Sequence, residues 1–248
     1  HLKKYGNADA PDVGEFKVEP PHRKDGTTNF YDAKSFIAYF EEHKGDSAAI
    51  YATMHPRPVF VAVLNDHNAE HAGFRDHRAS FTPSFSQEWS TWTQHNGRNH
   101  AFSSNDEFAT FLQQNAPDIV QPTPADMLSI ALNFRVKSDV SFKNAIRLSD
   151  GNTEFQFDNL VNAESIGSQG GKVAIPDRFF LEIPVFDGLH EPSYRIEAMF
   201  NFRTGVGERK LTLWYDLVRP QKTVQQAFKD IWNQIEEKTN VDILHGQP

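Results

Sequence analysis

The chain has 248 residues, of which 38% are hydrophobic and 12% aromatic, and its formal net charge is −8. This length and apolar content exclude disorder of the whole chain and predict a sizeable core. With no cysteine, the chain has no disulfides, cysteine–zinc sites or thiolate chemistry. Residues 1–133 carry a charge of −6 and residues 134–248 a charge of −2, so neither half is a basic nucleic-acid footprint.

No segment reaches the ~20 apolar residues of a membrane span, and the start of the chain lacks the apolar stretch of a signal peptide. These features, with the missing cysteine, predict a soluble, cytoplasmic protein without a membrane partner. Because the chain begins at His1 rather than Met, it is compatible with a longer natural amino terminus.

Residues 1–29 mix Gly, Asp, Pro and Lys and predict an extended arm, with a short strand from Glu15 to Val18. Such an arm suits contact with a neighbouring subunit. Asp32 is a typical cap for a helix that carries apolar residues at near-helical spacing and stops near Gly45. A strand is expected over 48–53.

Two further strand-like segments, 58–64 and 79–85, flank a loop rich in Asp and His. Three helices are expected after this loop. The first is capped by Ser86, and the second by Ser104, which forms a capping box with Glu107 three residues later. The third is capped by Thr123 and covers 125–134.

From residue 139 onward, short alternating segments predict an antiparallel sheet of about six strands. The expected strands lie around 140–148, 155–157, 173–175, 179–185, 194–202 and 210–218, with a turn at Asp150-Gly151. Apolar residues from Val224 to Ile235 form one stripe of a final amphipathic helix that ends near Lys238.

The predicted fold class is therefore α+β. Amino-terminal helices lie on a small sheet, and a largely antiparallel carboxy-terminal sheet is closed by the final amphipathic helix. The predicted organisation is an extended arm (1–29), an α+β subdomain (30–133) and an antiparallel-sheet subdomain with the carboxy-terminal helix (134–248).

Six segments together resemble the YfdQ-like family of uncharacterised phage and prophage proteins. They are 35–39, 76–79, 117–119, 145–151, 211–220 and 235–239, and the resemblance runs from about residue 30 to the end. No catalytic residue transfers with it. It implies a phage-encoded protein linked to phage DNA metabolism or host takeover, in the cytoplasm of an infected or lysogenic bacterium, with a phage or host protein as a partner.

The densest set of reactive side chains comprises two Asp-His pairs, Asp66-His67 and Asp76-His77, at the two ends of one loop. If the flanking strands pair antiparallel, both pairs meet at one end of the sheet. Their carboxylates and imidazoles are ligand types that zinc or manganese accepts. His67 and His71 are four residues apart, as on a metalloprotease helix, but the residues between them do not follow the Glu-first order of that motif and Gly73 favours a loop. A structural hydrogen-bond cluster is therefore favoured, with no cofactor.

Arg75, Arg78 and Trp92 are candidates for contact with a single-stranded nucleic acid, since bases stack on aromatic rings and arginines meet phosphates. Aromatic residues at helical spacing more often belong to the core, and that interpretation of Trp92 is favoured. The segment Ser168–Lys172 lacks the spacing of a phosphate-binding loop and is interpreted as a connection between strands.

The leading functional hypothesis is a non-enzymatic, self-assembling protein, because the chain has a polar arm, many strands with exposed edges and no complete catalytic motif. One alternative is a metal-dependent hydrolase or nuclease at the Asp-His loop. A further alternative is a module that binds single-stranded nucleic acid.

Overall fold

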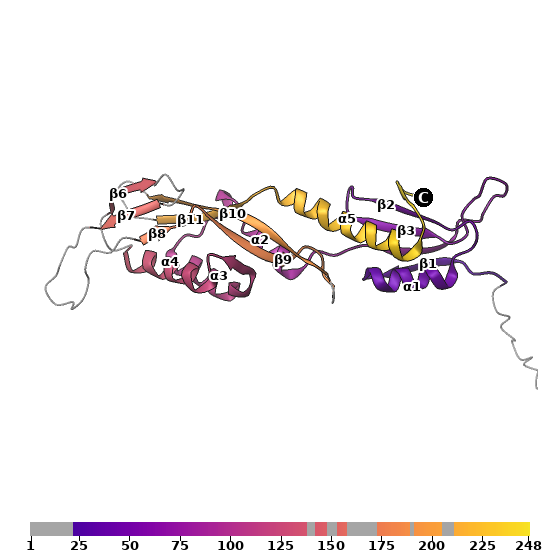
Figure 1. The fold of residues 1–248 in the computed structure, drawn as a ribbon, viewed down its shortest axis with the longest axis horizontal. Coiled ribbons are helices and arrows are strands. Elements are labelled where there is room, and N and C mark those ends of the chain that lie inside the picture. Colours follow the sequence, from indigo (N-terminus) through magenta and orange to yellow (C-terminus); the bar gives the residue numbers. More distant parts are fainter. Residues whose placement is uncertain (1–21, 138–141, 148–152, 158–172, 189–190, 205–210) are drawn as a thin grey trace, which may run out of the picture.

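The computed structural model describes residues 22–137, 142–147, 153–157, 173–188, 191–204 and 211–248, and the protein is elongated (Figure 1). A five-stranded sheet lies at one end with helices α1 and α5. A four-stranded sheet runs through the middle, and a three-stranded sheet lies at the far end beside α4 (Figure 1).

The five-stranded sheet takes strands from both ends of the described chain. In spatial order it contains β1 (Gly26–Phe30), β4 (His77–Phe81), β3 (Val59–Val63), β2 (Ala49–Thr53) and β12 (Ile243–His245). The two outer strands run parallel to their neighbours, whereas β2, β3 and β4 pair antiparallel. Side chains alternate along each strand, so Phe60, Ala62 and Phe81 lie on one buried face.

Two helices cover that buried face. Helix α1 (Ala33–His43) begins at Asp32, whose carboxylate accepts a hydrogen bond of 2.7 Å from the N–H of Ser35. Helix α5 (Pro220–Thr239) contacts α1, and its Phe228 ring stacks on Phe60 with 4.9 Å between centroids. The helix therefore joins the carboxy-terminal part of the chain to the amino-terminal sheet.

The four-stranded sheet is antiparallel. Its order is β11 (Leu211–Leu217), β10 (Ser193–Thr204), β9 (Arg178–Pro184) and β5 (Ile119–Gln121). Around it lie α2 (Gln87–Gln94), α3 (Asn105–Gln114) and the short 3-10 helices η1 (Arg98–His100) and η2 (Ala116–Asp118). The core here is aromatic: the buried Trp92 ring packs against Phe111 and Tyr215.

The three-stranded sheet is also antiparallel. It contains β6 (Phe142–Arg147), β7 (Thr153–Phe157) and β8 (Val173–Ile175), and α4 (Pro124–Lys137) contacts β8 (Figure 1). Thr123 caps α4, because its hydroxyl accepts a hydrogen bond of 3.2 Å from the N–H of Asp126.

The predicted α+β class is confirmed, and so are the caps at Asp32, Ser86, Ser104 and Thr123. Strand β4 begins at His77, two residues before the predicted segment, so His77 and Arg78 belong to the strand rather than to the loop. The strands of the carboxy-terminal half divide between two sheets instead of forming one. Three short or polar strands, β1, β5 and β12, were not predicted.

The final helix contacts β10 but packs mainly on α1 and the five-stranded sheet, whereas the sequence analysis placed it on the carboxy-terminal sheet. Its apolar stripe fits either sheet, and the pattern alone does not choose between them. Strands β5 and β12 also pair outside the subdomain range that contains each of them. The division into 1–29, 30–133 and 134–248 stays a prediction. The expected strand at Glu15–Val18, the turn at Asp150-Gly151 and the Ser168–Lys172 connection lie outside the described residues.

Candidate functional site

The loop that joins β3 to β4, residues 64–76, lies at the outer end of the five-stranded sheet. Gly73 packs tightly against the start of the loop, since a Cβ atom at this position would lie 2.1 Å from the carbonyl oxygen of Asp66. Arg75 has a positive φ of 59°, a backbone conformation that residues other than glycine seldom adopt. The backbone therefore takes one closed shape that brings both ends of the loop together.

Asp66 is buried and holds the loop to β2. Its carboxylate accepts hydrogen bonds of 2.7 Å from the Tyr51 hydroxyl and from the N–H of His67. The Nε of Arg75 lies 2.8 Å from Asp66 Oδ1, an ion pair whose N–H is not aligned as a hydrogen bond. Burial alone would raise the pKa of Asp66, but the two hydrogen bonds and the Arg75 charge lower it.

Asp76 holds the other end of the loop. A guanidinium nitrogen of Arg23 donates to its carboxylate at 2.6 Å, and the side-chain amide of Asn65 donates at 2.9 Å. These two donors lower the pKa of Asp76 to about 2. The carboxylate is thus ionised at neutral pH and ties the segment before β1 to the loop.

His77 points to the opposite face of the sheet from Asp66. Only 6% of it is exposed, and its Nε2 lies 3.1 Å from the hydroxyl of Tyr39 on α1. The His43 ring lies 5.9 Å away between centroids, and Lys24 Nζ lies 2.9 Å from His43 Nδ1. Burial, followed by the charges of His43 and Lys24, lowers the pKa of His77.

The two Asp-His pairs therefore lie at the same end of the sheet, as expected, but bind different partners on its two faces. His67 Nδ1 accepts a hydrogen bond of 2.9 Å from the N–H of Gly73, so this ring also stabilises the loop. Within the described ranges, no three His, Asp or Glu side chains are grouped so as to hold a metal ion. The metal-dependent alternative stays a prediction.

Of the nucleic-acid candidates, Arg75 pairs with Asp66, and Arg78 donates through Nε to the carbonyl of Arg75 at 2.7 Å. Trp92 is fully buried and donates to Asp118 at 2.7 Å, so its ring belongs to the core and offers no stacking surface. Phe74 belongs to no pattern that marks a site in the sequence, but it is 74% exposed and has the Arg23 guanidinium 4.4 Å from its ring centroid.

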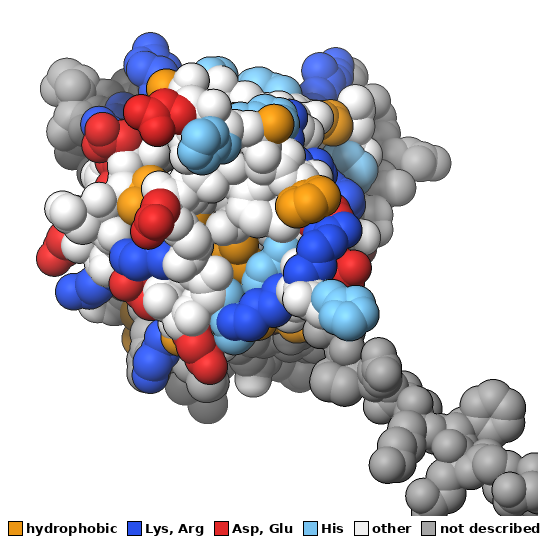
Figure 2. Space-filling model, turned by 90° about the vertical axis from the view of Figure 1, so that its right-hand side faces the viewer, with side chains coloured by type: hydrophobic (Ala, Val, Ile, Leu, Met, Phe, Trp, Pro, Cys, Tyr) orange, Lys and Arg blue, Asp and Glu red, His pale blue; other side chains and the backbone are white. Residues whose placement is uncertain are grey.

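Figure 2 looks onto this outer end of the molecule. Lys, Arg and His side chains dominate one side of it, whereas most acidic side chains lie on the other side. The basic side is a local feature of this end, since the chain as a whole has a formal net charge of −8. An exposed aromatic ring at this end offers a surface on which a planar group can stack.

Strand β1 forms one edge of the five-stranded sheet. It pairs with β4 on one side, and among the described residues no strand pairs with its other side. Four of its five residues are exposed, and its sequence, Gly-Thr-Thr-Asn-Phe, contains neither a charge nor a proline. Tyr31, which follows directly, is 83% exposed. Within the described residues, the five positions of this edge strand carry none of the charges or prolines that usually prevent strand addition.

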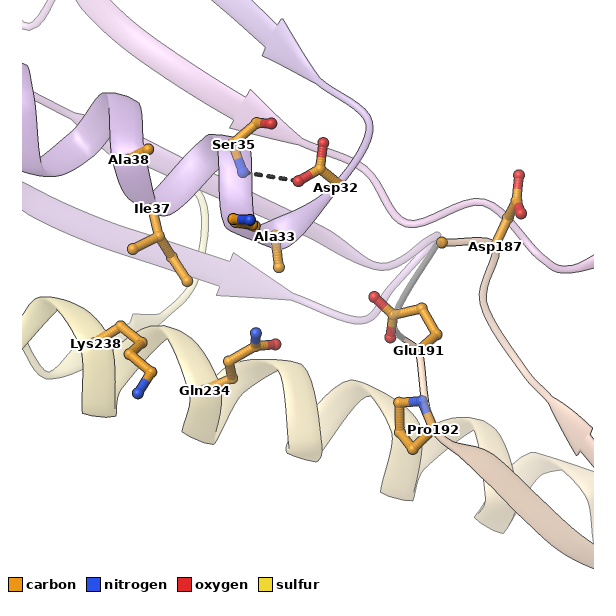
Figure 3. Close-up of a pocket in the computed structure, with 12 residues that line it drawn as sticks. Asp32, Ala33, Ser35, Ile37, Ala38, Asp187, Glu191, Pro192, Gln234 and Lys238 are labelled. Atoms are coloured by element: carbon orange, nitrogen blue, oxygen red, sulfur yellow. Dashed lines mark hydrogen bonds between the residues drawn. The ribbon is translucent and has the colours of Figure 1, made fainter.

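A groove of about 1110 Å³ lies between α1, α5 and the connection from β9 to β10 (Figure 3). Ile37 points from α1 toward α5, and Ala33 and Pro192 add apolar surface. Residues from three distant parts of the chain meet here: 32–38, then 187–188 with 191–192, and 234–238. No local sequence pattern connects these segments, so the sequence alone does not predict the groove.

Charged side chains lie around the apolar surface of the groove. Asp32 and Glu191 lie near the start of α1, and Lys34 and Lys238 also line the groove (Figure 3). Burial, and then the charge of Asp32, raises the pKa of Glu191. No basic side chain among the described residues pairs with Glu191.

Comparison with known proteins places the chain in a family but gives it no activity. The family model described as "Uncharacterized conserved protein (DUF2303)" matches residues 9–248. The chain belongs to this family. No curated protein and no solved structure matches it.

None of the helices in the described part of the chain combines the length and the apolar character that crossing a membrane requires.

Proposed function

We propose that this protein is non-enzymatic and self-associates through the β1 edge of the five-stranded sheet. The observation that carries the proposal is the exposed, uncharged edge of β1, followed by the exposed Tyr31 ring. A free edge presents a row of backbone donors and acceptors that a second strand satisfies. Most soluble homo-oligomers are symmetric, so the simplest second strand is β1 of another copy.

In a twofold pair the two β1 strands run antiparallel. If the axis passes near Thr28, Gly26 of one copy lies opposite Phe30 of the other. Thr27 and Asn29 project from the face of the sheet that neither α1 nor α5 covers, because Thr28 and Phe30 contact Tyr39 on α1. The exposed Tyr31 of each copy then lies at the end of the joined strands.

Sedimentation velocity at micromolar concentration tests this proposal, with wild type compared to the double variant Thr27→Lys and Asn29→Lys. Wild type is expected to sediment as a dimer or a larger assembly. The added lysines place like charges across the joined edge and should raise the dissociation constant about tenfold or more.

The matched control is Thr53→Lys. It places a lysine on the face of the sheet that carries Thr27 and Asn29, but on β2, which has a neighbouring strand on each side. This variant should associate like wild type. A wild type that stays monomeric at every concentration would remove the proposal, as would equal weakening by the control and the β1 variant.

The biological setting we propose is that of a phage or prophage accessory protein. Its support is the resemblance to the YfdQ-like family, which implies a link to phage DNA metabolism or host takeover. Sequencing the genes on either side of the coding region tests this setting. Recombination or single-strand-binding genes are expected there, and a neighbourhood of chromosomal housekeeping genes alone would contradict it.

A second candidate function, binding of single-stranded nucleic acid, is favoured by the exposed Phe74 ring with Arg23 stacked on it. Bases stack on exposed aromatic rings, and arginines near the ring neutralise phosphates. The uneven charge of this end of the molecule adds to the argument (Figure 2).

Fluorescence anisotropy with a labelled oligothymidine tests this second function. Binding should weaken as salt rises from about 50 to 200 mM and should fall on Phe74→Ala. The control Leu244→Ala removes an exposed apolar side chain elsewhere on the sheet and should leave binding unchanged. No binding at low salt would eliminate this candidate.

A further inference from the structure

We propose that the groove between α1 and α5 holds the arm segment Phe16–Val18 of a second copy. The inference rests on the proposed self-association and assigns a second contact between the same two chains. The groove and the segment complement each other in apolar character and in charge. Pairing of the β1 edges places the arm of one copy near the groove of the other.

The groove offers an apolar surface with a carboxylate beside it. Ile37, Ala33 and Pro192 form the apolar part, and Glu191 lies close to the start of α1 (Figure 3). Asp32 lies nearby, and its charge disfavours ionisation of Glu191. A cation placed between these two carboxylates relieves this repulsion and replaces the water lost through burial.

The arm carries a segment of matching chemistry. Phe16 and Val18 are apolar and alternate with Lys17, so an extended backbone directs the two apolar side chains to one side and the ammonium to the other. Glu15 and Glu19 flank the segment. Lys17 therefore matches the carboxylates of the groove, while the flanking glutamates match Lys34 and Lys238.

The geometry of the joined edges favours a second copy over the same chain. In the antiparallel pair whose axis passes near Thr28, Gly26 of one copy lies opposite Phe30 of the other, so residues before Gly26 run toward Tyr31 and Asp32 of that copy. Asp32 lines the groove. Val18 lies eight positions before Gly26, and an extended chain over these eight steps spans at most roughly 26 Å. The segment therefore reaches the groove without any change in the sheet.

The chain contains no cysteine, so single introduced thiols report this contact cleanly. Ser35→Cys puts a thiol in the groove with little change of shape, and Val18→Cys puts one in the arm. The two variants are mixed and treated with a short bismaleimide cross-linker. A cross-linked dimer is expected from the mixture. Gln113→Cys, on the exposed surface of α3, is the matched control and should give no dimer with either thiol.

Charge reversal tests the assigned pairing. Lys17→Glu in the arm chain, or Glu191→Lys in the groove chain, should lower the cross-linking rate severalfold, and the two together should restore it. No cross-link between Val18→Cys and Ser35→Cys overturns the inference. A cross-link formed only within a chain that carries both thiols also overturns it.

Sedimentation of the same samples separates the two proposals. Dimers that sediment normally but do not cross-link at the groove contradict only the arm contact. Monomers contradict the self-association itself.

Discussion

At the residue scale, the loop between β3 and β4 depends on Gly73. Its Cα packs against the backbone of Asp66, where a Cβ would lie 2.1 Å from a carbonyl oxygen. That contact brings the N–H of Gly73 to His67 and leaves Arg75 close to Asp66. The reactive residues of the Asp-His loop thus keep the loop closed, as the structural interpretation of the sequence expects.

Gly73→Ala should destabilise the protein, because the new methyl group overlaps backbone atoms that have no room to move. The expected loss is about 1 to 3 kcal/mol in the free energy of unfolding, measured by chemical denaturation. Gly246→Ala is the control, since its Cβ meets nothing within 4 Å. Equal stability of the Gly73→Ala protein and wild type would mean that the loop is loosely packed.

His77 makes stability depend on pH. Its pKa in the folded protein is lowered by burial, and the charges of His43 and Lys24 add to the effect while Asp25 and Asp76 oppose it. The unfolded chain therefore binds a proton more readily than the folded protein, and stability falls as the pH drops below about 6.5 toward the lowered pKa. Above this window the contribution is constant.

The pH dependence can be assigned by measuring the free energy of unfolding of wild type and His77→Gln between about pH 5 and 8. The variant should lose part of the fall in stability at the acidic end. His71→Gln, in the same loop and exposed, is the control and should keep it. An unchanged profile in His77→Gln would assign the effect to another group.

At the element scale, α5 links the two ends of the chain. The helix packs on α1 and on Phe60 of β3, and β12 after it adds an edge strand to β2. The five-stranded sheet is therefore incomplete until the last residues of the chain are in place. Completion of this sheet therefore includes long-range contacts between the amino-terminal strands and residues 220–248.

Phe228→Ala tests this coupling. The change removes a buried ring that stacks on Phe60, and it should lower the free energy of unfolding by about 3 to 5 kcal/mol. Lys229→Ala alters the adjacent exposed position and should have little effect. A small loss with Phe228→Ala would contradict the close packing of α5 on the sheet.

The sequence predicts the helices well because their signals are local. The caps at Asp32, Ser86 and Ser104 each depend on a contact between residues three apart in the chain. Strand β1 escapes prediction because its polar sequence has no apolar alternation, and it forms only through pairing with β4. Three residues, as in β12, are too short a strand for periodicity to detect.

The candidate site follows the same division. Antiparallel pairing of β3 and β4 does bring the two Asp-His pairs to one end of the sheet. Because β4 already begins at His77, this ring alternates in phase with Ala79 and Phe81 and lies on the face that α1 covers. The groove depends on three segments that meet only in the folded protein.

At the scale of the whole molecule, the protein is an elongated body whose β1 edge is open among the described residues (Figure 1). Joined edges would make one continuous sheet from two chains, and the arm would extend across the joint to the groove of the second copy. Both contacts add area without requiring either chain to refold.

Amide hydrogen exchange at β1 over a dilution series tests this account most directly. The amides of Thr27, Thr28 and Asn29 are followed at several protein concentrations, with the interior strand β3 as the reference. Protection of the outward-facing β1 amides should rise with protein concentration, while protection in β3 stays constant. Protection at β1 that does not depend on concentration would contradict self-association through this edge.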